Sequence, residues 1–294
     1  MLDFIKYTQI QLREREGTFV PHGPSFGRAR PANIRLPLST LKLKLPRHAP
    51  MRGGSFEEKK VYRGVYTLEG RSYNRNTMPS QSWKQTLIAN RQWVFNGPWF
   101  TGRMGQVAFS IEGLYPAKPN PKLNFLHPKA FETGVLGYLT ASEGHRLYDE
   151  GRLTPYRRAP LNWTPLPNLP LPAVQFDMAE AEPLARYRFV FFPASRDKLI
   201  HIGFSYRQAC AGSQAEQDEK ISPKPMLDLI DNIISSIRLT LSPGLEAELE
   251  EIRKSCPDLA VSPGCPPLKW PAHVDKDGIT IIDYDKRLYA TPSY

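Results

Sequence analysis

The sequence predicts an α+β protein in which antiparallel sheets pack against helices. Segments with the two-residue period of a half-buried strand occur beside segments whose apolar residues recur at helical spacing. Proline supplies 29 of the 294 residues, so we expect many ordered loops and extended segments. Apolar residues make up 40% of the chain and charged residues 23%, which is typical of a globular protein with a sizeable core.

Changes in composition divide the chain into three parts. Residues 1–55 are predicted to form a basic, proline-rich N-terminal arm that begins with a short amphipathic helix over residues 1–16. Residues 56–154 and 174–294 are each predicted to be an α+β domain, either as two units or as one continuous fold. The prolines between residues 155 and 173 indicate either a linker or an ordered crossing loop.

The arm contains one clear strand pattern, at Thr40–Leu45. Leu41, Leu43 and Leu45 fall on one side of this segment, and Lys42 and Lys44 fall on the other. This alternation is the period of a strand with one solvent-facing side. Because proline flanks the segment, we predict an edge strand or an extended arm laid on another surface.

The patterns between residues 56 and 128 are shorter. Residues 61–70 predict a second strand, and residues 80–90 predict a short helix with Trp83, Leu87 and Ile88 on its apolar side. The tripeptide at 96–98, Asn-Gly-Pro, indicates a turn between two extended apolar runs. Val107–Ile111 predicts a strand, and residues 116–128 predict a proline-rich loop.

A helix is predicted over Lys129–Gly151, in one or two pieces. Thr140 and Glu143 form a capping-box pattern that would begin the second piece.

The strongest periodicity lies in the C-terminal half. Arg186–Pro193 and Lys198–Gln208 predict a β-hairpin around the turn PASRD. Ser222 and Pro223 then indicate the start of a helix, because serine caps and proline favours the first turn. The predicted core face of that helix consists of Met226, Ile230, Ile233, Ile234 and Ile237.

The helix runs into a predicted strand, IRLTL, that stops at Ser242–Pro243. A further helix is predicted over Leu245–Cys256, with Leu245, Leu249 and Ile252 on one face, and a hairpin around Asp283–Lys286.

The unit formed by this hairpin, helix and strand, with the run LDLIDNIISSIRL, resembles the closing unit of Mog1/PsbP-like domains. Similar endings occur in immunity proteins and chaperone-like accessory proteins of bacterial type VI secretion. The resemblance covers residues 186–241 only, and its motif is structural. It implies a non-enzymatic binding protein that neutralises or escorts a toxic effector, and it transfers no functional residue.

The sequence contains one literal match to a catalytic motif. Gly23–Pro24–Ser25–Phe26–Gly27 fits the G-x-S-x-G pattern of serine hydrolases, but no helical pattern follows the serine as the nucleophile elbow requires. We therefore interpret this segment as a proline/glycine turn. No glycine-rich phosphate loop is recognisable, and we assign no catalytic residue.

No cofactor or metal site is predicted either. The six histidines show no tight metal-ligand spacing, and we interpret His201 as a satisfied sheet residue. Cys256 and Cys265 bracket a loop that an oxidising compartment would allow to close as a disulfide.

Positive charge is concentrated in the first third of the chain. The whole chain has a formal net charge of +10, and residues 1–100 carry 17 Lys/Arg against 6 Asp/Glu. Such asymmetry indicates an acidic protein partner, an anionic membrane surface or nucleic acid. We expect the binding face to draw on the basic segment Arg35–Arg47. The candidate contact residues are Lys42, Lys44 and Arg47, together with the aromatic residues Trp93, Trp99 and Phe100. These aromatic residues indicate either a hot-spot cluster for a protein partner or core residues at the edge of a sheet.

The functional hypothesis is a non-enzymatic protein-binding module, namely an immunity or accessory protein for a toxic, acidic effector of type VI secretion. The alternatives are an enzyme with a scattered active site, and a basic binder of nucleic acid or anionic membrane. No nucleic-acid-binding signature supports the nucleic-acid alternative. The chain shows no transmembrane segment, although peripheral contact with a membrane stays open. As written it predicts a cytoplasmic protein, or a periplasmic one if a leader or anchor has been removed.

Overall fold

The computed structural model describes residues 17–51, 53–68, 83–98, 101–118, 120, 122–143, 157–180 and 186–268. Two antiparallel sheets and four α-helices make up this part of the chain, which confirms the predicted α+β class. The predicted helix over residues 1–16 and the predicted hairpin around Asp283–Lys286 lie outside the described residues. Among the described helices, none is long and apolar enough to cross a bilayer.

The strands of the two sheets are β1 Arg30–Leu36, β2 Ser39–Leu45, β3 Trp83–Asn96, β4 Arg103–Pro116, β5 Arg157–Pro165, β6 Val174–Glu180, β7 Arg186–Pro193, β8 Leu199–Gln208 and β9 Arg238–Leu241. The helices are the 3-10 helix η2 Phe26–Arg28 and the α-helices α2 Pro128–Glu143, α3 Gln214–Lys220, α4 Lys224–Ser235 and α5 Pro243–Arg253.

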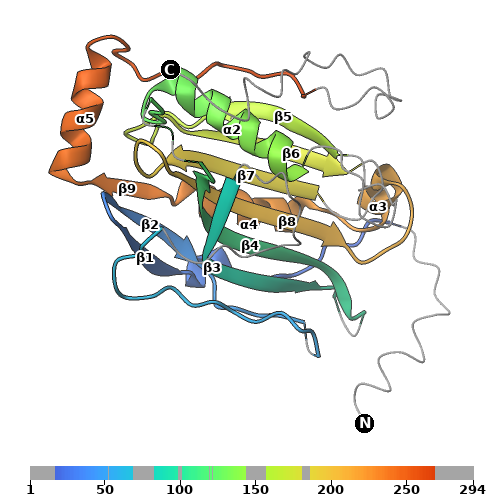
Figure 1. Ribbon diagram of the computed structural model, residues 1–294. Helices are drawn as coiled ribbons and strands as arrows, with labels where there is room; N and C mark the ends of the chain where they lie inside the picture. Colours follow the sequence, from blue (N-terminus) through green and yellow to red (C-terminus); the bar gives the residue numbers. More distant parts are fainter. Residues whose placement is uncertain are drawn as a thin grey trace.

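The elements form three layers (Figure 1). The middle layer is a six-stranded sheet with the order β3-β4-β8-β7-β6-β5. Helix α2 packs on one face of this sheet, and α4 packs on the other face together with a three-stranded sheet of order β1-β2-β9. Each interface between layers holds its own apolar core, so the six-stranded sheet is buried from both sides.

The pairing of β4 with β8 sets the two faces of the six-stranded sheet. The register runs from Gly105 opposite Gln208 to Leu114 opposite Leu199. Because side chains alternate across a strand, Phe109 and Ile202 point toward α4, while Glu112 and His201 point toward α2.

On the α2 face, a row of stacked rings crosses four strands. The rings are Trp163 of β5, Phe176 of β6, Phe191 of β7 and His201 of β8. Successive ring centroids lie 5.6, 5.5 and 4.7 Å apart, and the planes are tilted by 9°, 6° and 21°. Such pairs stabilise by about 0.5–1.5 kcal/mol beyond their buried area, and here they also fix the plane of the His201 ring.

In the three-stranded sheet, β2 confirms the predicted alternation but not the predicted edge position. Leu41, Leu43 and Leu45 are at most 2% exposed, whereas Lys42 and Lys44 are exposed. β2 is the central strand, because β1 pairs with one side and β9 with the other. The flanking prolines do not prevent this, since Pro37 lies in the turn after β1 and Pro46 lies beyond the last paired residue.

The helix predicted over residues 80–90 is wrong where the structure describes it, because β3 begins at Trp83. The register between β3 and β4 shifts between Leu87 and Ala89, and this irregularity leaves Ile88 and Ala89 both buried. Two successive buried residues break the two-residue period of a strand and imitate the spacing of a helix. The turn predicted at 96–98 is confirmed, and Gly97 N donates to Gly102 O at its closure.

The strand predicted over residues 61–70 is also wrong for its described part. Residues 61–68 contain only an isolated bridge, between Val65 and Arg35 of β1. Tyr62 and Val65 are 64% and 55% exposed, so these two apolar residues face solvent, whereas Leu68 is buried.

Helix α2 runs without interruption through Thr140, so the second helical piece predicted to begin there is wrong. The Thr140 hydroxyl donates to the Leu136 carbonyl 3.0 Å away, as a residue inside a helix does, and caps no helix start. Residues 144–151, the end of the predicted helix, lie outside the described part.

Residues 157–165 form the edge strand β5, within the stretch that the sequence predicted as a linker or a crossing loop. Its pairing with β6 is interrupted by two register shifts, between Arg158 and Leu161 and between Leu161 and Thr164. An edge strand tolerates proline because one side of its backbone needs no ladder partner. The domain boundaries stay a prediction, although the sheet β1-β2-β9 joins residues of the N-terminal arm to the C-terminal half.

The C-terminal hairpin, helix and strand are confirmed as β7, β8, α4 and β9. Helix α4 begins one residue after Pro223, and Lys224 N donates to Ser222 Oγ over 3.3 Å. The predicted core residues are all at most 6% exposed: Met226, Ile230, Ile233 and Ile234 lie in α4, and Ile237 lies two residues beyond its end. Helix α5 is confirmed, and it ends three residues before the predicted Cys256.

The unpaired edge of β3 is covered by residues 46–59, which we call the edge segment. Ala49 N donates to Gln92 O over 3.0 Å and Val94 N donates to Ala49 O over 3.0 Å. Arg91 and Glu58 add an ion pair of 3.0 Å. An exposed edge of this length would invite pairing with another chain, and the edge segment occupies it.

Ile233→Ala should lower the free energy of unfolding by about 2–5 kcal/mol, because it leaves a cavity between α4 and the sheets. The control is Ser235→Ala, which changes an exposed residue of the same helix. Urea denaturation measures both variants, and equal midpoints would contradict the buried position of Ile233.

His48 should make the edge segment sensitive to acid. His48 Nδ1 accepts a hydrogen bond from Gln92 N at 3.0 Å, so this nitrogen must carry no proton. Burial is the main cause that lowers the pKa of His48; the Glu58 charge opposes it and the Arg91 charge adds to it, and the net pKa lies below the ordinary value. The unfolded chain therefore binds the proton more readily, and stability is lost as the pH falls below about 6.5.

The measurement is urea unfolding of the wild type and His48→Gln. The stability advantage of the wild type should shrink between about pH 7.5 and about pH 5.5, and stay constant from about pH 7.5 to about pH 8.5. An advantage that grows in acid would contradict this role of His48.

Candidate functional site

The outer face of the three-stranded sheet is basic and carries no acid. The register places Arg35 and Thr40 opposite each other, then Asn33 and Lys42, and brings Arg238 of β9 to the other side of Lys42. None of the residues in β1, β2 and β9 is aspartate or glutamate. We call the exposed side chains of Arg35, Lys42, Lys44 and Arg238 the basic face.

Two like charges stand directly opposite each other on this face. Lys42 pairs in register with Arg238, an arrangement that costs a sheet about 0.2–1 kcal/mol. Within the described residues, no carboxylate pairs with Arg35, Lys42 or Lys44. Arg238 donates to the carbonyls of Ser235 and Ile237 at the end of α4, at 2.8 and 2.7 Å.

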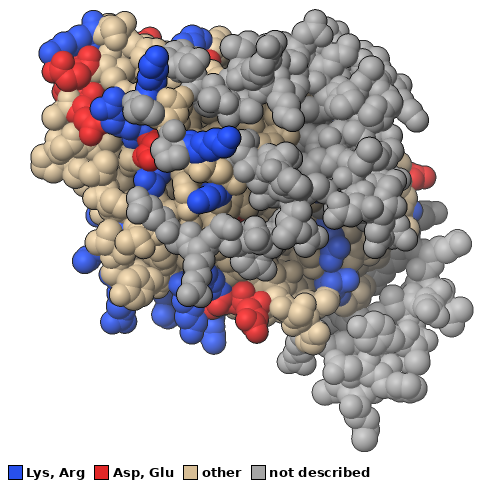
Figure 2. Space-filling view, viewed as in Figure 1, with Lys and Arg blue, Asp and Glu red and all other residues tan. Residues whose placement is uncertain are grey.

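Figure 2 shows Lys and Arg side chains gathered along the lower edge of the molecule, below the strands that Figure 1 labels β1, β2 and β3, beside a smaller acidic area. Lys42 and Lys44 are exposed on the side of β2 opposite its buried leucines, as their alternation predicted. Arg47 is exposed just beyond β2, and its carbonyl accepts a hydrogen bond from Trp93 Nε1 over 3.0 Å.

Trp93 is not a surface residue, which corrects its predicted place in an aromatic contact cluster. It is 0% exposed and packs against Phe109, with ring centroids 5.8 Å apart. Its position in the middle of β3, between the sheets, explains the burial. Trp99 and Phe100, the other predicted members, lie outside the described residues.

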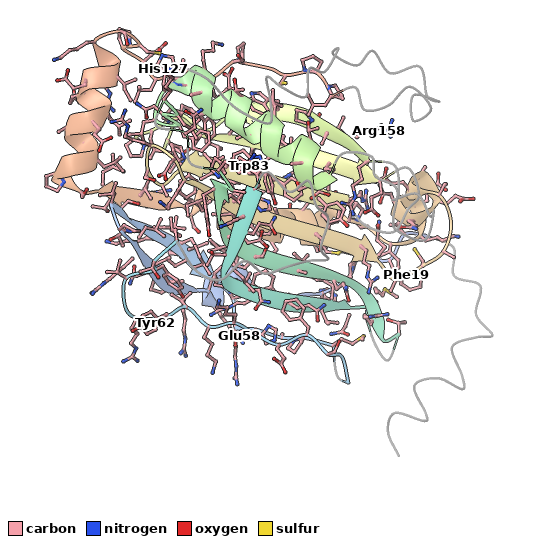
Figure 3. All side chains as sticks on the ribbon, viewed as in Figure 1. Phe19, Glu58, Tyr62, Trp83, His127 and Arg158 are labelled. Atoms are coloured by element: carbon pink, nitrogen blue, oxygen red, sulfur yellow. The ribbon has the colours of Figure 1, made fainter. Side chains whose placement is uncertain are left out.

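A different aromatic residue borders the basic face. Tyr62 is 64% exposed, and Val65 next to it bridges to Arg35 of β1. Figure 3 shows Tyr62 and Glu58 on the segment that runs below the strands, far from Trp83 and His127 beside α2. The Tyr62 ring meets the Tyr66 ring edge-on at 6.1 Å, and the Tyr66 hydroxyl donates to Ile88 O at 3.3 Å. Tyr62 was not among the predicted contact residues, because its segment was predicted to be a strand.

Ser25 lies in a surface turn. It is exposed and precedes η2, a 3-10 helix of three residues, and its side chain makes no capping bond there. A nucleophile elbow joins a sheet strand to an α-helix, and Ser25 has neither on its two sides.

Among the described residues, no group of three or more His, Cys, Asp or Glu side chains is arranged to hold a metal ion. The three cysteines are free thiols. Burial, and to a smaller extent the Glu132 charge, raises the pKa of Cys265 to about 11, so this thiol is protonated at neutral pH.

Only one of the two ring nitrogens of His201 has a hydrogen-bond partner among the described residues. Its ring is buried, and Nδ1 lies 3.4 Å from Glu112 Oε2, but Nε2 has no hydrogen-bond partner among the described residues. A buried polar atom without a partner costs about 1–3 kcal/mol. The sequence prediction of a satisfied sheet histidine therefore holds for Nδ1 and fails for Nε2.

A cavity of about 580 Å³ lies between α4 and the strands β5 and β6. Its charged side chains are already matched within the protein. Arg188 Nε donates to Asp177 Oδ1 over 2.7 Å and its Nη1 donates to Asp231. These ion pairs join α4 to the sheet, so we assign them a structural role.

Comparison of the chain with protein-family models, with curated proteins and with solved structures gives no match in any of the three. The fold and the surface therefore define a class only: an α+β protein with two antiparallel sheets, one of which presents a basic face.

Ser25→Ala should leave hydrolysis of a generic ester, p-nitrophenyl acetate, at the wild-type rate, because Ser25 occupies a turn. Loss of a measurable wild-type turnover in Ser25→Ala, with an unchanged melting temperature, would contradict this assignment.

Proposed function

We propose that this chain is a non-enzymatic protein-binding module whose acidic partner docks on the basic face. The observation that carries the proposal is the solvent-facing side of β1, β2 and β9, which holds Arg35, Lys42, Lys44 and Arg238 and no acidic residue. Such a surface attracts a partner of opposite charge and accelerates the encounter.

The unfavourable pair Lys42–Arg238 supports a binding role. Arg238 has a structural role, because it donates to the carbonyls of Ser235 and Ile237. The solvent-facing strand position of Lys42, by contrast, accepts almost any polar residue. The fold itself therefore does not require a cation at position 42. Departures from the local rules of stability are expected at functional sites, where the loss is offset by binding.

Tyr62 favours a protein partner over nucleic acid. An exposed tyrosine and an exposed valine at the border of the basic face provide apolar contact area, and tyrosine with arginine is typical of protein–protein hot spots. Tyr62 is held by its contact with Tyr66, so little side-chain freedom would be lost on binding.

The finer form of the proposal is an immunity or accessory protein for a toxic effector of type VI secretion. Its support is the resemblance of residues 186–241 to the closing unit of Mog1/PsbP-like domains, a region that folds as the predicted hairpin, helix and strand. The acidic surface of such an effector would be the partner of the basic face.

Reversing two charges of the face, Lys42→Glu with Lys44→Glu, should slow association with the partner by about tenfold at low salt, because encounter is steered by charge. The partner is first identified by affinity capture from the native host with mass spectrometry. Stopped-flow or surface-based kinetics at two salt concentrations then measure the association rate of each variant, and the difference should diminish at high salt.

The matched control is Lys118→Glu with Lys122→Glu, which makes the same change of charge in the exposed loop between β4 and α2. If the control slows association as much as the double change on β2, net charge alone acts and the basic face is not the interface. Capture of nucleic acid in place of a protein would also contradict the proposal.

A further inference from the structure

The α2 face of the six-stranded sheet contains a pocket of about 360 Å³ that is separate from the basic face. Its floor is formed by β4 and β8, and Tyr138 and Glu143 near the end of α2 contribute to its wall. A volume of this order is typical of sites for small ligands.

The pocket exists because the row of side chains on β4 and β8 becomes small at this point. The register sets Ser110 opposite Gly203 and Ala108 opposite Ser205. A Cβ at position 203 would lie 3.2 Å from His201 Nε2 and 3.4 Å from Ser110 Oγ. The glycine therefore leaves open the space between these two polar atoms.

His201 is held in a fixed orientation beside this space. Its ring stacks on Phe191 with a centroid distance of 4.7 Å and meets Phe189 edge-on at 4.8 Å. Nδ1 faces Glu112 Oε2 at 3.4 Å, and a carboxylate oxygen can only accept a hydrogen bond. In the neutral imidazole this contact places the ring hydrogen on Nδ1, which leaves a lone pair on Nε2 over Gly203.

Nε2 has no partner among the described residues, although the histidine is only 6% exposed. It requires a donor, which means an O–H or N–H group of a bound molecule. The other polar groups that line the pocket include both hydrogen-bond donors and hydrogen-bond acceptors. The hydroxyls of Ser110 and Ser205 donate and accept, and the guanidinium of Arg157 is bound by Glu143 and Glu180.

Charge and shape narrow the ligand class further. The carboxylate of Glu112 disfavours an anion, whereas the charges of Glu143 and Arg157 offset each other because the two side chains form an ion pair. Hydroxyl groups satisfy both donors and acceptors without charge. The rings of Tyr187 and Phe189 add apolar surface to the lining, and the Arg157 guanidinium lies over the Tyr187 ring, 5.7 Å from its centroid. Such apolar surface can pack against the C–H groups of a ligand.

We propose that this pocket binds a neutral, polyhydroxylated small molecule of the size of a monosaccharide, with one ligand hydroxyl donating to His201 Nε2 over Gly203. A ligand of this size with ordinary efficiency binds with a Kd of about 1 mM. The site is independent of the basic face, so either assignment can fail without the other.

The test uses the full chain labelled with ¹⁵N at its histidines. Glucose, N-acetylglucosamine and myo-inositol are titrated to about 50 mM, well above the expected Kd, and NMR follows the imidazole nitrogens. Sodium acetate and n-butylammonium chloride serve as the charged probes. At least one of the three polyols should move the His201 Nε2 resonance saturably, with no change at the exposed His22, and the charged probes should not.

Gly203→Ala should weaken that binding by about tenfold or more, because the methyl group enters the space between His201 and Ser110. Gly264→Ala is the matched control, since a Cβ there meets no atom within 4 Å. Should Gly203→Ala fail to fold, Ser110→Val fills the same space from β4 and should have the same effect. The double change Lys42→Glu with Lys44→Glu should leave polyol binding unchanged.

The proposal is overturned if none of the three polyols moves the His201 resonance. It is also overturned if acetate or butylammonium moves that resonance as strongly, or if the response survives in a folded Gly203→Ala or Ser110→Val.

Discussion

β4 and β8 pair over ten successive residues, and this register assigns every side chain of the two strands to one of two environments. Toward α4, the alternation places Val107, Phe109 and Ile202 in the core that also receives the leucines of β2. Toward α2, the same alternation places Glu112 opposite His201 and Ser110 opposite Gly203. A slip of one residue would exchange these sets, burying a carboxylate among apolar side chains at a cost of several kcal/mol.

The two edge strands of the six-stranded sheet, β3 and β5, are each protected from pairing with another chain. β3 would present an open edge, and the edge segment occupies it with backbone hydrogen bonds at Ala49 and an ion pair at Arg91. The prolines of this segment prevent it from becoming a regular strand that could itself recruit a further chain. At the opposite edge, β5 carries its prolines where the ladder is already irregular.

The three-stranded sheet depends on this arrangement as well. The inner leucines of β2 pack on α4, and α4 in turn packs on the large sheet. One side of β2 is therefore buried, and its lysines must face solvent. The basic face is a consequence of the packing of α4, which links the proposed binding surface to the same core that the β4–β8 register creates.

The sequence predicted the parts in which a single period is maintained. The alternation of β2 and the apolar spacing of α4 each bury one continuous face, and the hairpin β7–β8 consists of two apolar runs around a short turn, so each was recognisable. The prediction failed where the register is broken, as at Leu87 and Ala89 of β3, because two successive buried residues resemble a helical pattern. It also failed at residues 61–68, where Tyr62 and Val65 stay exposed.

The residues of the candidate sites were predictable only where the period of a single strand determines their position. Lys42 and Lys44 were found from alternation alone, because the period of one strand decides which side faces solvent. Arg238 was missed, since its place beside Lys42 depends on the pairing of β9 with β2, two strands far apart in the chain. The pocket over Gly203 was missed for the same reason, because it exists only in the register between two distant strands.

The central claim is the register of β4 with β8, and backbone nuclear Overhauser effects in the ¹⁵N,¹³C-labelled protein test it most directly. The structure predicts contacts that join Ser110 to Gly203 and Glu112 to His201 across the two strands. Hα–Hα or amide–amide contacts that join Ser110 to Ile202 or to Phe204 in place of Gly203 would mean a slipped register, and would contradict both the core assigned to the α4 face and the pocket assigned to the α2 face.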